Sequence, residues 1–256
     1  MWHRLLTCEC ATFITCATWY HVDVKGTRPS DRLGFKSLYR RNLPHIQPLH
    51  ATLFVTFRLA DSLPQHVLAY LAEERRLLQQ RLNSNQLSTA RSRSINLARR
   101  HFAMLEACLD RATEGPTWLS NCAVADLVAE ALHYRDAKQY RLDTFSIMPN
   151  HVHAVFAPLM KGAVPHSLSS IMHSLKRNTA KRANEVLQRC GTFWEHETFD
   201  HYIRNQGEWK RILRYVLDNP VKAGLVRTWQ EWPWNYVRDA EEIGRKLTTC
   251  ATTTAE

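Results

Sequence analysis

Residues 148–156 read MPNHVHAVF, and this stretch is the most informative part of the sequence because two histidines flank one apolar residue in a strand-like run. Its apolar second half predicts a β-strand that begins at His151. Side chains alternate between the faces of a strand, so His151 and His153 point the same way and Val152 points to the other side. Two imidazoles on one rigid face can form half of a metal site. The spacing alone is more often explained by histidines that hydrogen-bond to neighbours or face water.

Strand-like and helix-like patterns alternate on both sides of this stretch. We expect strands at 51–59, 140–147, 151–157 and 199–204, helices at 65–80, 97–111, 123–133, 167–188 and 205–219, and a polar loop at 83–96. The last helix begins with a capping box, Asn205 followed by Glu208, and should end before Pro220. This order fits an α+β fold, a four-stranded antiparallel sheet with helices packed on one face.

The length of 256 residues suits one domain with additions better than two full domains. Residues 1–37 lack convincing periodicity, and we expect a poorly ordered extension there. The domain itself should cover 38–237, and 238–256 should form a flexible tail.

The chain is basic, with 34 Lys and Arg against 24 Asp and Glu and a net charge of +10. This balance favours a polyanionic partner, nucleic acid first and an anionic membrane second. Seven cysteines form no C-x-x-C pair, which is typical of reduced thiols. No run reaches the roughly 20 apolar residues of a membrane span. We therefore expect a cytoplasmic protein that does not enter a membrane.

The helix predicted at 205–219 carries polar groups with helical spacing. Tyr215 and Asn219 are four residues apart and lie on one face, with Arg211 one turn before them. A tyrosine in a helix usually packs in the core or at its rim. An asparagine before a proline usually ends a helix, which is a sufficient explanation for Asn219. These residues alone leave both alternatives open.

Several basic side chains are candidates for phosphate contacts, although any one of them is about as often merely solvated. They are Lys176, Arg177 and Lys181 of the helix at 167–188, together with Arg204, Arg211 and Lys222.

Taken together, the motifs of residues 50–234 resemble the HUH single-tyrosine transposases, especially the REP-associated tyrosine transposases of bacteria. The motifs that carry the resemblance are MPNHVH at 148–153, GTFWE at 191–195 followed by FDHYIR at 199–204, and YVLDNPVKAG at 215–224. The segment YRRNLPH at 39–45 also looks like the usual start of such proteins. Three motifs in this order are far more specific than His-x-His.

The resemblance implies a ferredoxin-like sheet that presents His151 and His153 to Mg²⁺ or Mn²⁺. It implies that Tyr215 attacks a DNA phosphodiester and forms a 5′-phosphotyrosine. Relatives often place a polar residue, commonly Gln, one turn after the tyrosine as the third metal ligand. Here that position holds Asn219, a neutral oxygen donor that is acceptable to Mg²⁺. Two imidazoles with one amide oxygen fit Mn²⁺ slightly better than Mg²⁺.

The same resemblance implies that residues 38–237 form a transposase-type catalytic domain, with a helical insertion at 65–131 between strands 1 and 2. The expected partner is single-stranded DNA with REP-like hairpins, nicked and rejoined, and a homodimer is a family expectation. Two alternatives remain: a catalytically idle module that binds DNA hairpins, and a metal-dependent phosphodiester hydrolase that does not use the tyrosine.

Overall fold

The computed structural model describes residues 36–40, 44–82, 100–111 and 115–239. The predicted extension at 1–37, the loop at 83–96 and the tail at 238–256 therefore lie mostly or wholly outside the described residues. The chain divides into two units, one formed by 1–27 and 66–107 and the other by 28–65 and 108–256. The proposed domain boundaries at 37 and 238 stay predictions.

The smaller unit is helical where it is described. It contains nearly all of α2 (Gln65–Leu82) and the helical residues 100–107. Its two helices are linked by Glu74, whose carboxylate binds His101 Nε2 at 2.8 Å and Arg100 at 3.3 Å. The helices predicted at 65–80 and 97–111 are confirmed over the described residues.

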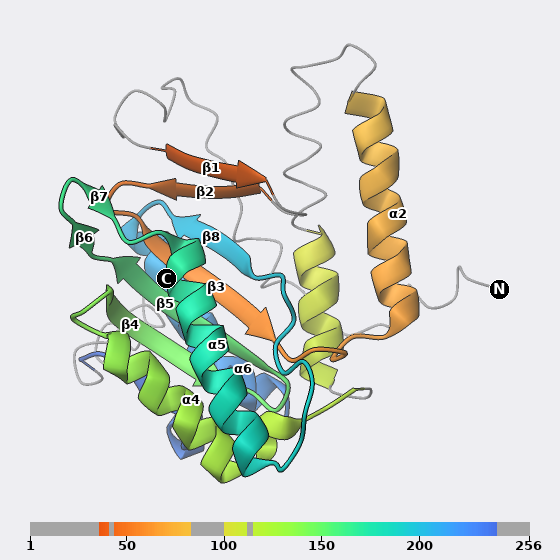
Figure 1. The fold of residues 1–256 in the computed structure, drawn as a ribbon, viewed down its shortest axis with the longest axis vertical. Helices are drawn as coiled ribbons and strands as arrows, with labels where there is room; N and C mark the ends of the chain where they lie inside the picture. Colours follow the sequence, from red (N-terminus) through yellow and green to blue (C-terminus); the bar gives the residue numbers. More distant parts are fainter. Residues whose placement is uncertain (1–35, 41–43, 83–99, 112–114, 240–256) are drawn as a thin grey trace, which may run out of the picture. The chain divides into compact units, whose positions relative to one another are not determined.

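The larger unit is built on an antiparallel sheet of five strands in the order β8-β3-β5-β4-β9 (Figure 1). The strands are β3 (Thr52–Arg58), β4 (Tyr140–Ile147), β5 (His151–Pro158), β8 (Phe199–Ile203) and β9 (Asn235–Val237). Two small hairpins accompany the sheet, β1 (Lys36–Arg40) with β2 (Pro44–Pro48) and β6 (Met160–Lys161) with β7 (Val164–Pro165).

The predicted α+β class with an antiparallel sheet is confirmed, but the strand count differs by one. The four predicted strands are all present within one or two residues of their expected ends. The fifth, β9, pairs with β4 at the sheet edge and contains three residues. A strand this short shows no alternation to detect, because one period of the pattern takes two residues.

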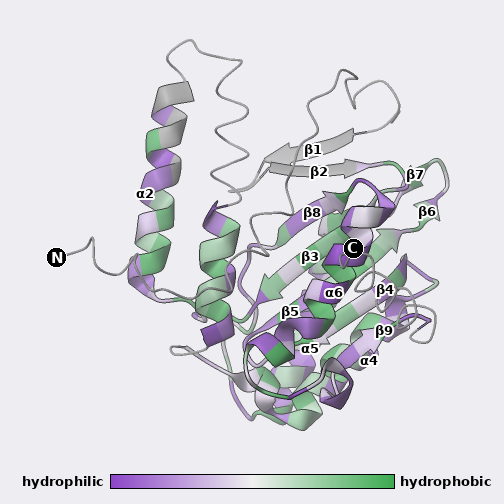
Figure 2. Ribbon diagram, turned by 180° about the vertical axis from the view of Figure 1, so that it is seen from behind, coloured by the Kyte–Doolittle hydropathy of each residue, from purple (hydrophilic) through white to green (hydrophobic). Residues whose placement is uncertain are grey.

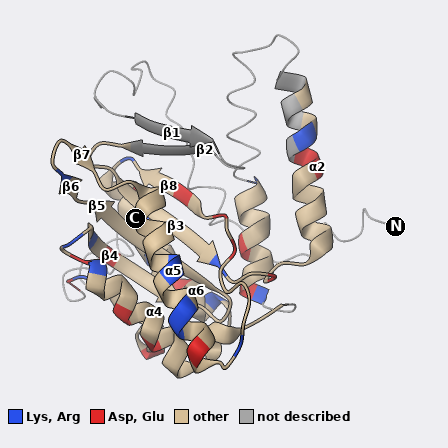
Figure 3. Cartoon of the chain, in the orientation of Figure 1, with Lys and Arg blue, Asp and Glu red and all other residues tan. Residues whose placement is uncertain are grey.

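One face of the sheet carries the main apolar core. The inward side chains of β3 are Leu53, Val55 and Phe57, all at most 1% exposed. They belong to one buried cluster with the apolar stripes of α4 (Cys122–Arg135) and α5 (Leu168–Val186). In Figures 1 and 2 these two helices lie together against the sheet. Figure 3 shows acidic residues on α4 and basic residues on α5. Arg182 of α5 pairs with Glu130 of α4 at 2.8 Å.

The last helix, α6 (Gln206–Lys222), covers the opposite face, which corrects the expectation that all helices pack on one side. The side chains of β3 that point to this face include Phe54, whose ring meets the ring of Tyr215 edge-on at 6.0 Å. Figure 2 shows α6 in front of the sheet from this side. The amphipathic pattern of α6 predicts a buried stripe but carries no information about which face of the sheet receives it.

The helix also continues through Pro220 to Lys222, whereas we expected it to end before the proline. Its start is as predicted, since Asn205 Oδ1 accepts from Glu208 N at 2.9 Å. Pro220 removes one backbone donor near the end of the helix, where the loss is small. Leu225 N donates to the carbonyl of Pro220 and Gly224 N to that of Val221, at 2.9 and 3.0 Å. Gly224, with φ of 71°, makes this C-terminal turn possible.

Candidate active site

The two histidines lie side by side on β5, on the face that α6 covers. Both are 0% exposed, and their Nε2 atoms are 3.0 Å apart. In the sheet, His153 stands opposite Thr56 and His151 opposite Arg58. The prediction that both imidazoles share one face is confirmed by this geometry.

The orientation of the His151 ring is fixed by Asn150. The Asn150 amide nitrogen donates to the carbonyl of Leu109 at 3.0 Å, which leaves its oxygen facing His151 Nδ1 at 2.7 Å. An amide oxygen only accepts, so His151 Nδ1 carries the proton and donates. In the neutral ring, Nε2 then has its lone pair directed at His153. Two nitrogen atoms at 3.0 Å need a proton or a cation between them.

The His153 ring is held in the same manner by Thr56. The Thr56 hydroxyl lies 2.8 Å from His153 Nδ1 in a buried contact. Burial, and secondly the charge of Lys222, lower the pKa of His153 from 6.5 to about 3. This histidine is therefore neutral near pH 7, which is the form that binds metal ions.

The hydroxyl of Thr56 should matter for metal binding. We expect Thr56→Val to weaken Mn²⁺ binding by about tenfold, because partners that orient metal-bound histidines typically have effects of this size. Isothermal titration of the DNA-free protein measures it. Thr52→Val changes the same side chain on the same strand, away from the histidines, and should leave the affinity unchanged. Equal affinities for the two variants would contradict the role of Thr56.

Asn219 lies within α6 and its side chain reaches the histidine pair. It is 0% exposed, and its Nδ2 atom is 3.2 Å from His153 Nε2. Its Oδ1 atom is buried with no hydrogen-bond partner among the described residues. Rotating the amide by 180° exchanges the two atoms and places the oxygen beside Nε2. This buried oxygen next to two imidazoles fits the donor set of a divalent cation.

Tyr215 is one helical turn before Asn219 and also packs against His153. It is 7% exposed, and its ring centroid lies 5.4 Å from that of His153. The ammonium of Lys222 lies 4.6 Å from the centre of the tyrosine ring. Among the described residues, α6 therefore brings a tyrosine, an amide and a cation to the buried histidine pair of β5.

The six predicted DNA-binding residues fall into separate groups. Lys222 joins the site, and Arg204 and Arg211 are exposed near the start of α6. Arg177 and Lys181 are exposed on α5, which covers the other face of the sheet. One phosphate at the histidine pair therefore cannot contact both sets.

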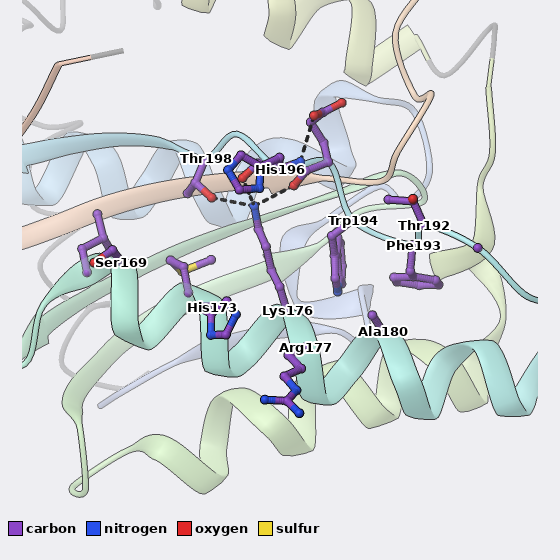
Figure 4. A pocket seen from close by; sticks show the side chains of 14 residues that line it. Ser169, His173, Lys176, Arg177, Ala180, Thr192, Phe193, Trp194, His196 and Thr198 are labelled. Atoms are coloured by element: carbon purple, nitrogen blue, oxygen red, sulfur yellow. Dashed lines mark hydrogen bonds between the residues drawn. The ribbon is translucent and has the colours of Figure 1, made fainter. Parts of the chain in front are cut away.

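Lys176, also on α5, is engaged within the protein. Its ammonium donates to the carbonyls of Glu195, His196 and Glu197 and to the Thr198 hydroxyl, at 2.7 to 3.2 Å. Figure 4 shows it spanning a pocket of about 350 Å³ between α5 and residues 191–198. These bonds hold that segment in place, and a phosphate contact by Lys176 stays a prediction.

Thr56, Asn150 and Asp110 are site residues that the sequence analysis did not single out. Asn150 had a signal, since it directly precedes His151. Thr56 alternates with the apolar residues of its strand, but the pattern of one strand does not identify the residue that lies opposite on the neighbouring strand. No pattern pointed to Asp110, whose Oδ1 lies 4.0 Å from His151 Nε2.

Comparisons with known proteins show what this region is similar to. Residues 123–219 match the family model described as "Transposase IS200 like". A REP-associated tyrosine transposase of Escherichia coli K12 is 24% identical over 100 residues, covering 38% of this chain and 54% of the relative. An uncharacterised protein of Haemophilus influenzae is 23% identical over 104 residues, covering 32% and 56%. The matched part thus spans about half the length of these curated relatives.

A solved structure of a REP-associated tyrosine transposase bound to a REP hairpin is also similar. It is 16% identical with a TM-score of 0.45, over 82% of this chain and 87% of that one. No helix in the described ranges is long and apolar enough to cross a membrane. The sequence resemblance is confirmed by the family match, and the matched segment, residues 123–219, contains both histidines, Tyr215 and Asn219.

Proposed function

We propose that this protein is a metal-dependent DNA transposase that nicks and rejoins single-stranded DNA with REP-like hairpins through a 5′-phosphotyrosine. The observation that carries the proposal is the contact of Tyr215 and Asn219 with His153 inside the family-matched segment. The net charge of +10 is consistent with a nucleic-acid partner.

The metal ion would be held by His151, His153 and Asn219. Mg²⁺ or Mn²⁺ bound there would withdraw charge from a non-bridging oxygen of the phosphodiester. The two histidine ligands are already oriented by the protein, because Thr56 and Asn150 hold the two rings through their Nδ1 atoms. Preorganised ligands need little rearrangement when the substrate arrives.

Tyr215 is the proposed nucleophile. Its phenol oxygen forms a bond to phosphorus and gives up its proton, the bond from phosphorus to the 3′-oxygen breaks, and the leaving 3′-oxygen takes up a proton. The products are a 3′-hydroxyl and a 5′-phosphotyrosine, so the phosphodiester bond energy is retained for rejoining. Lys222 lies beside the ring, where its charge favours a phosphodiester and the phenolate.

Arg204 and Arg211 extend the positive charge along α6 toward its start. An α-helix rises 1.5 Å per residue, so Arg211 is about 6 Å before Tyr215 along the axis. We propose that these side chains contact the DNA backbone on one side of the scissile phosphate. Arg177 and Lys181, on the other face, would contact a different part of the nucleic acid. Homodimerisation stays a prediction.

A covalent-adduct assay tests the function. Full-length protein is mixed with labelled single-stranded hairpin DNA from the flanks of its own locus and Mn²⁺, then run on a denaturing gel. We expect a labelled protein band that EDTA removes and that protease treatment shifts. Hairpin binding without any adduct, across several native hairpins, would favour the idle binding module. DNA cleavage without a covalent band would favour the hydrolase.

A further inference from the structure

The carboxylate of Asp110 approaches the histidine pair from a helix outside the family-matched segment. Residues 100–111 are helical, and their last part, 108–111, belongs to the same unit as the sheet. Asp110 Oδ1 is 4.0 Å from His151 Nε2. That oxygen has essentially no exposed surface, although 28% of the side chain is exposed. The acidic group is therefore placed at the nitrogen that faces His153.

The position of Asp110 is fixed by the same residue that orients His151. Asn150 binds the carbonyl of Leu109, the residue before Asp110, with one end of its amide and His151 with the other. Asn150 is itself held, because its carbonyl accepts from Leu59 N at 2.8 Å. The neighbouring Pro149 carbonyl accepts from Leu119 N at 3.1 Å. The bond to Leu109 ties the helix end to the turn that begins β5, and the other two backbone bonds hold that turn in place.

The separation between Asp110 and His151 fits two ligands of one ion. Ligands of an octahedral Mg²⁺ or Mn²⁺ are about 3 Å apart when adjacent and about 4 Å apart when opposite. The two Nε2 atoms are 3.0 Å apart, and the Asp110 oxygen is 4.0 Å from one of them. Two neutral imidazoles and an amide carry no charge, so a carboxylate would supply the negative charge that hard divalent cations prefer.

We propose that Asp110 is a further ligand of the metal ion, supplied by the helical insertion to the site formed by His151, His153 and Asn219. This inference rests on the proposed metal-dependent function. It gives the insertion a definite task, which is to complete the metal site from outside residues 123–219. An alternative is that Asp110 only neutralises a protonated His151, in which case it would not be needed to bind the ion.

Calorimetric titration of the full-length, DNA-free protein with Mn²⁺ separates these cases. We expect Asp110→Asn to raise the dissociation constant at least about tenfold, and His151→Ala to abolish binding. Glu130→Gln removes a carboxylate from α4, on the other face of the sheet, and should match the wild type. Thermal unfolding in EDTA should show that all variants remain folded.

Asp110→Asn could bind Mn²⁺ within twofold of the wild-type affinity while His151→Ala does not bind it. This result would overturn the role of Asp110 but would still support a metal site at the histidine pair. Absence of Mn²⁺ binding in the wild-type protein would also overturn it, since the protein alone would then not form the site. The covalent-adduct assay tests the proposed function separately, because a protein that binds Mn²⁺ through Asp110 can still fail to cleave DNA. The two proposals can therefore fail independently.

Discussion

Tyr215→Phe should eliminate the covalent adduct, lowering its rate of formation at least about a thousandfold, because the variant lacks the only atom that bonds to phosphorus. The substitution removes one oxygen and keeps the ring. The contacts of that ring with Phe54, His153 and Lys222 therefore remain possible. Quantitative denaturing gels over a time course measure the effect, and hairpin affinity should change by less than about threefold.

Tyr134→Phe is the matched control. Tyr134 lies on α4, on the other face of the sheet, and is 65% exposed. This variant should form the adduct at the wild-type rate. An adduct that persists in Tyr215→Phe would show that Tyr215 is not the nucleophile, whether or not Tyr134→Phe also forms it. Retained hairpin binding in Tyr215→Phe excludes misfolding as the cause of a lost adduct.

Local spacing was sufficient to predict where the site residues point within their own elements. The period of two places His151 and His153 on one face of β5, and four-residue spacing places Tyr215 and Asn219 on one face of α6. Both relations depend only on the geometry of one element. The prediction that these two elements meet came from the family resemblance, since no pattern in either element identifies its partner.

The features that the sequence did not predict depend on contacts between distant segments. Pro220 was expected to end α6, but the turn at Gly224 satisfies the last carbonyls and stabilises the helix beyond it. Asp110 reaches His151 across a separation of 41 residues, through the bond from Asn150 to Leu109. A single aspartate at the end of a helix has no spacing that distinguishes it from a solvated one.

The stability of the metal-free protein should fall steeply with acid because of His153. Its pKa is lowered from 6.5 to about 3 by burial and by Lys222, so the unfolded chain takes up this proton first as the pH falls. The contribution of the neutral His153 to the free energy of unfolding is therefore fully present above pH 6.5 and is lost as the pH falls toward about 3. The full interval corresponds to about 5 kcal/mol, and a change from pH 7 to pH 4 to about 3 kcal/mol.

Replacing His153 by Gln removes the titrating group and retains a polar side chain for Thr56. We expect the loss of unfolding free energy between pH 7 and pH 4 to be about 3 kcal/mol smaller in His153→Gln than in the wild type. Urea denaturation in EDTA, followed by tryptophan fluorescence, measures it. His173→Gln, which replaces an exposed histidine on α5, should keep the wild-type difference. Equal acid sensitivity of His153→Gln and the wild type would mean that His153 is hydrated or already paired in solution. A ring buried against Phe54 and Tyr215, with its Nδ1 on Thr56, predicts the opposite, because burial disfavours the charged form of the imidazole.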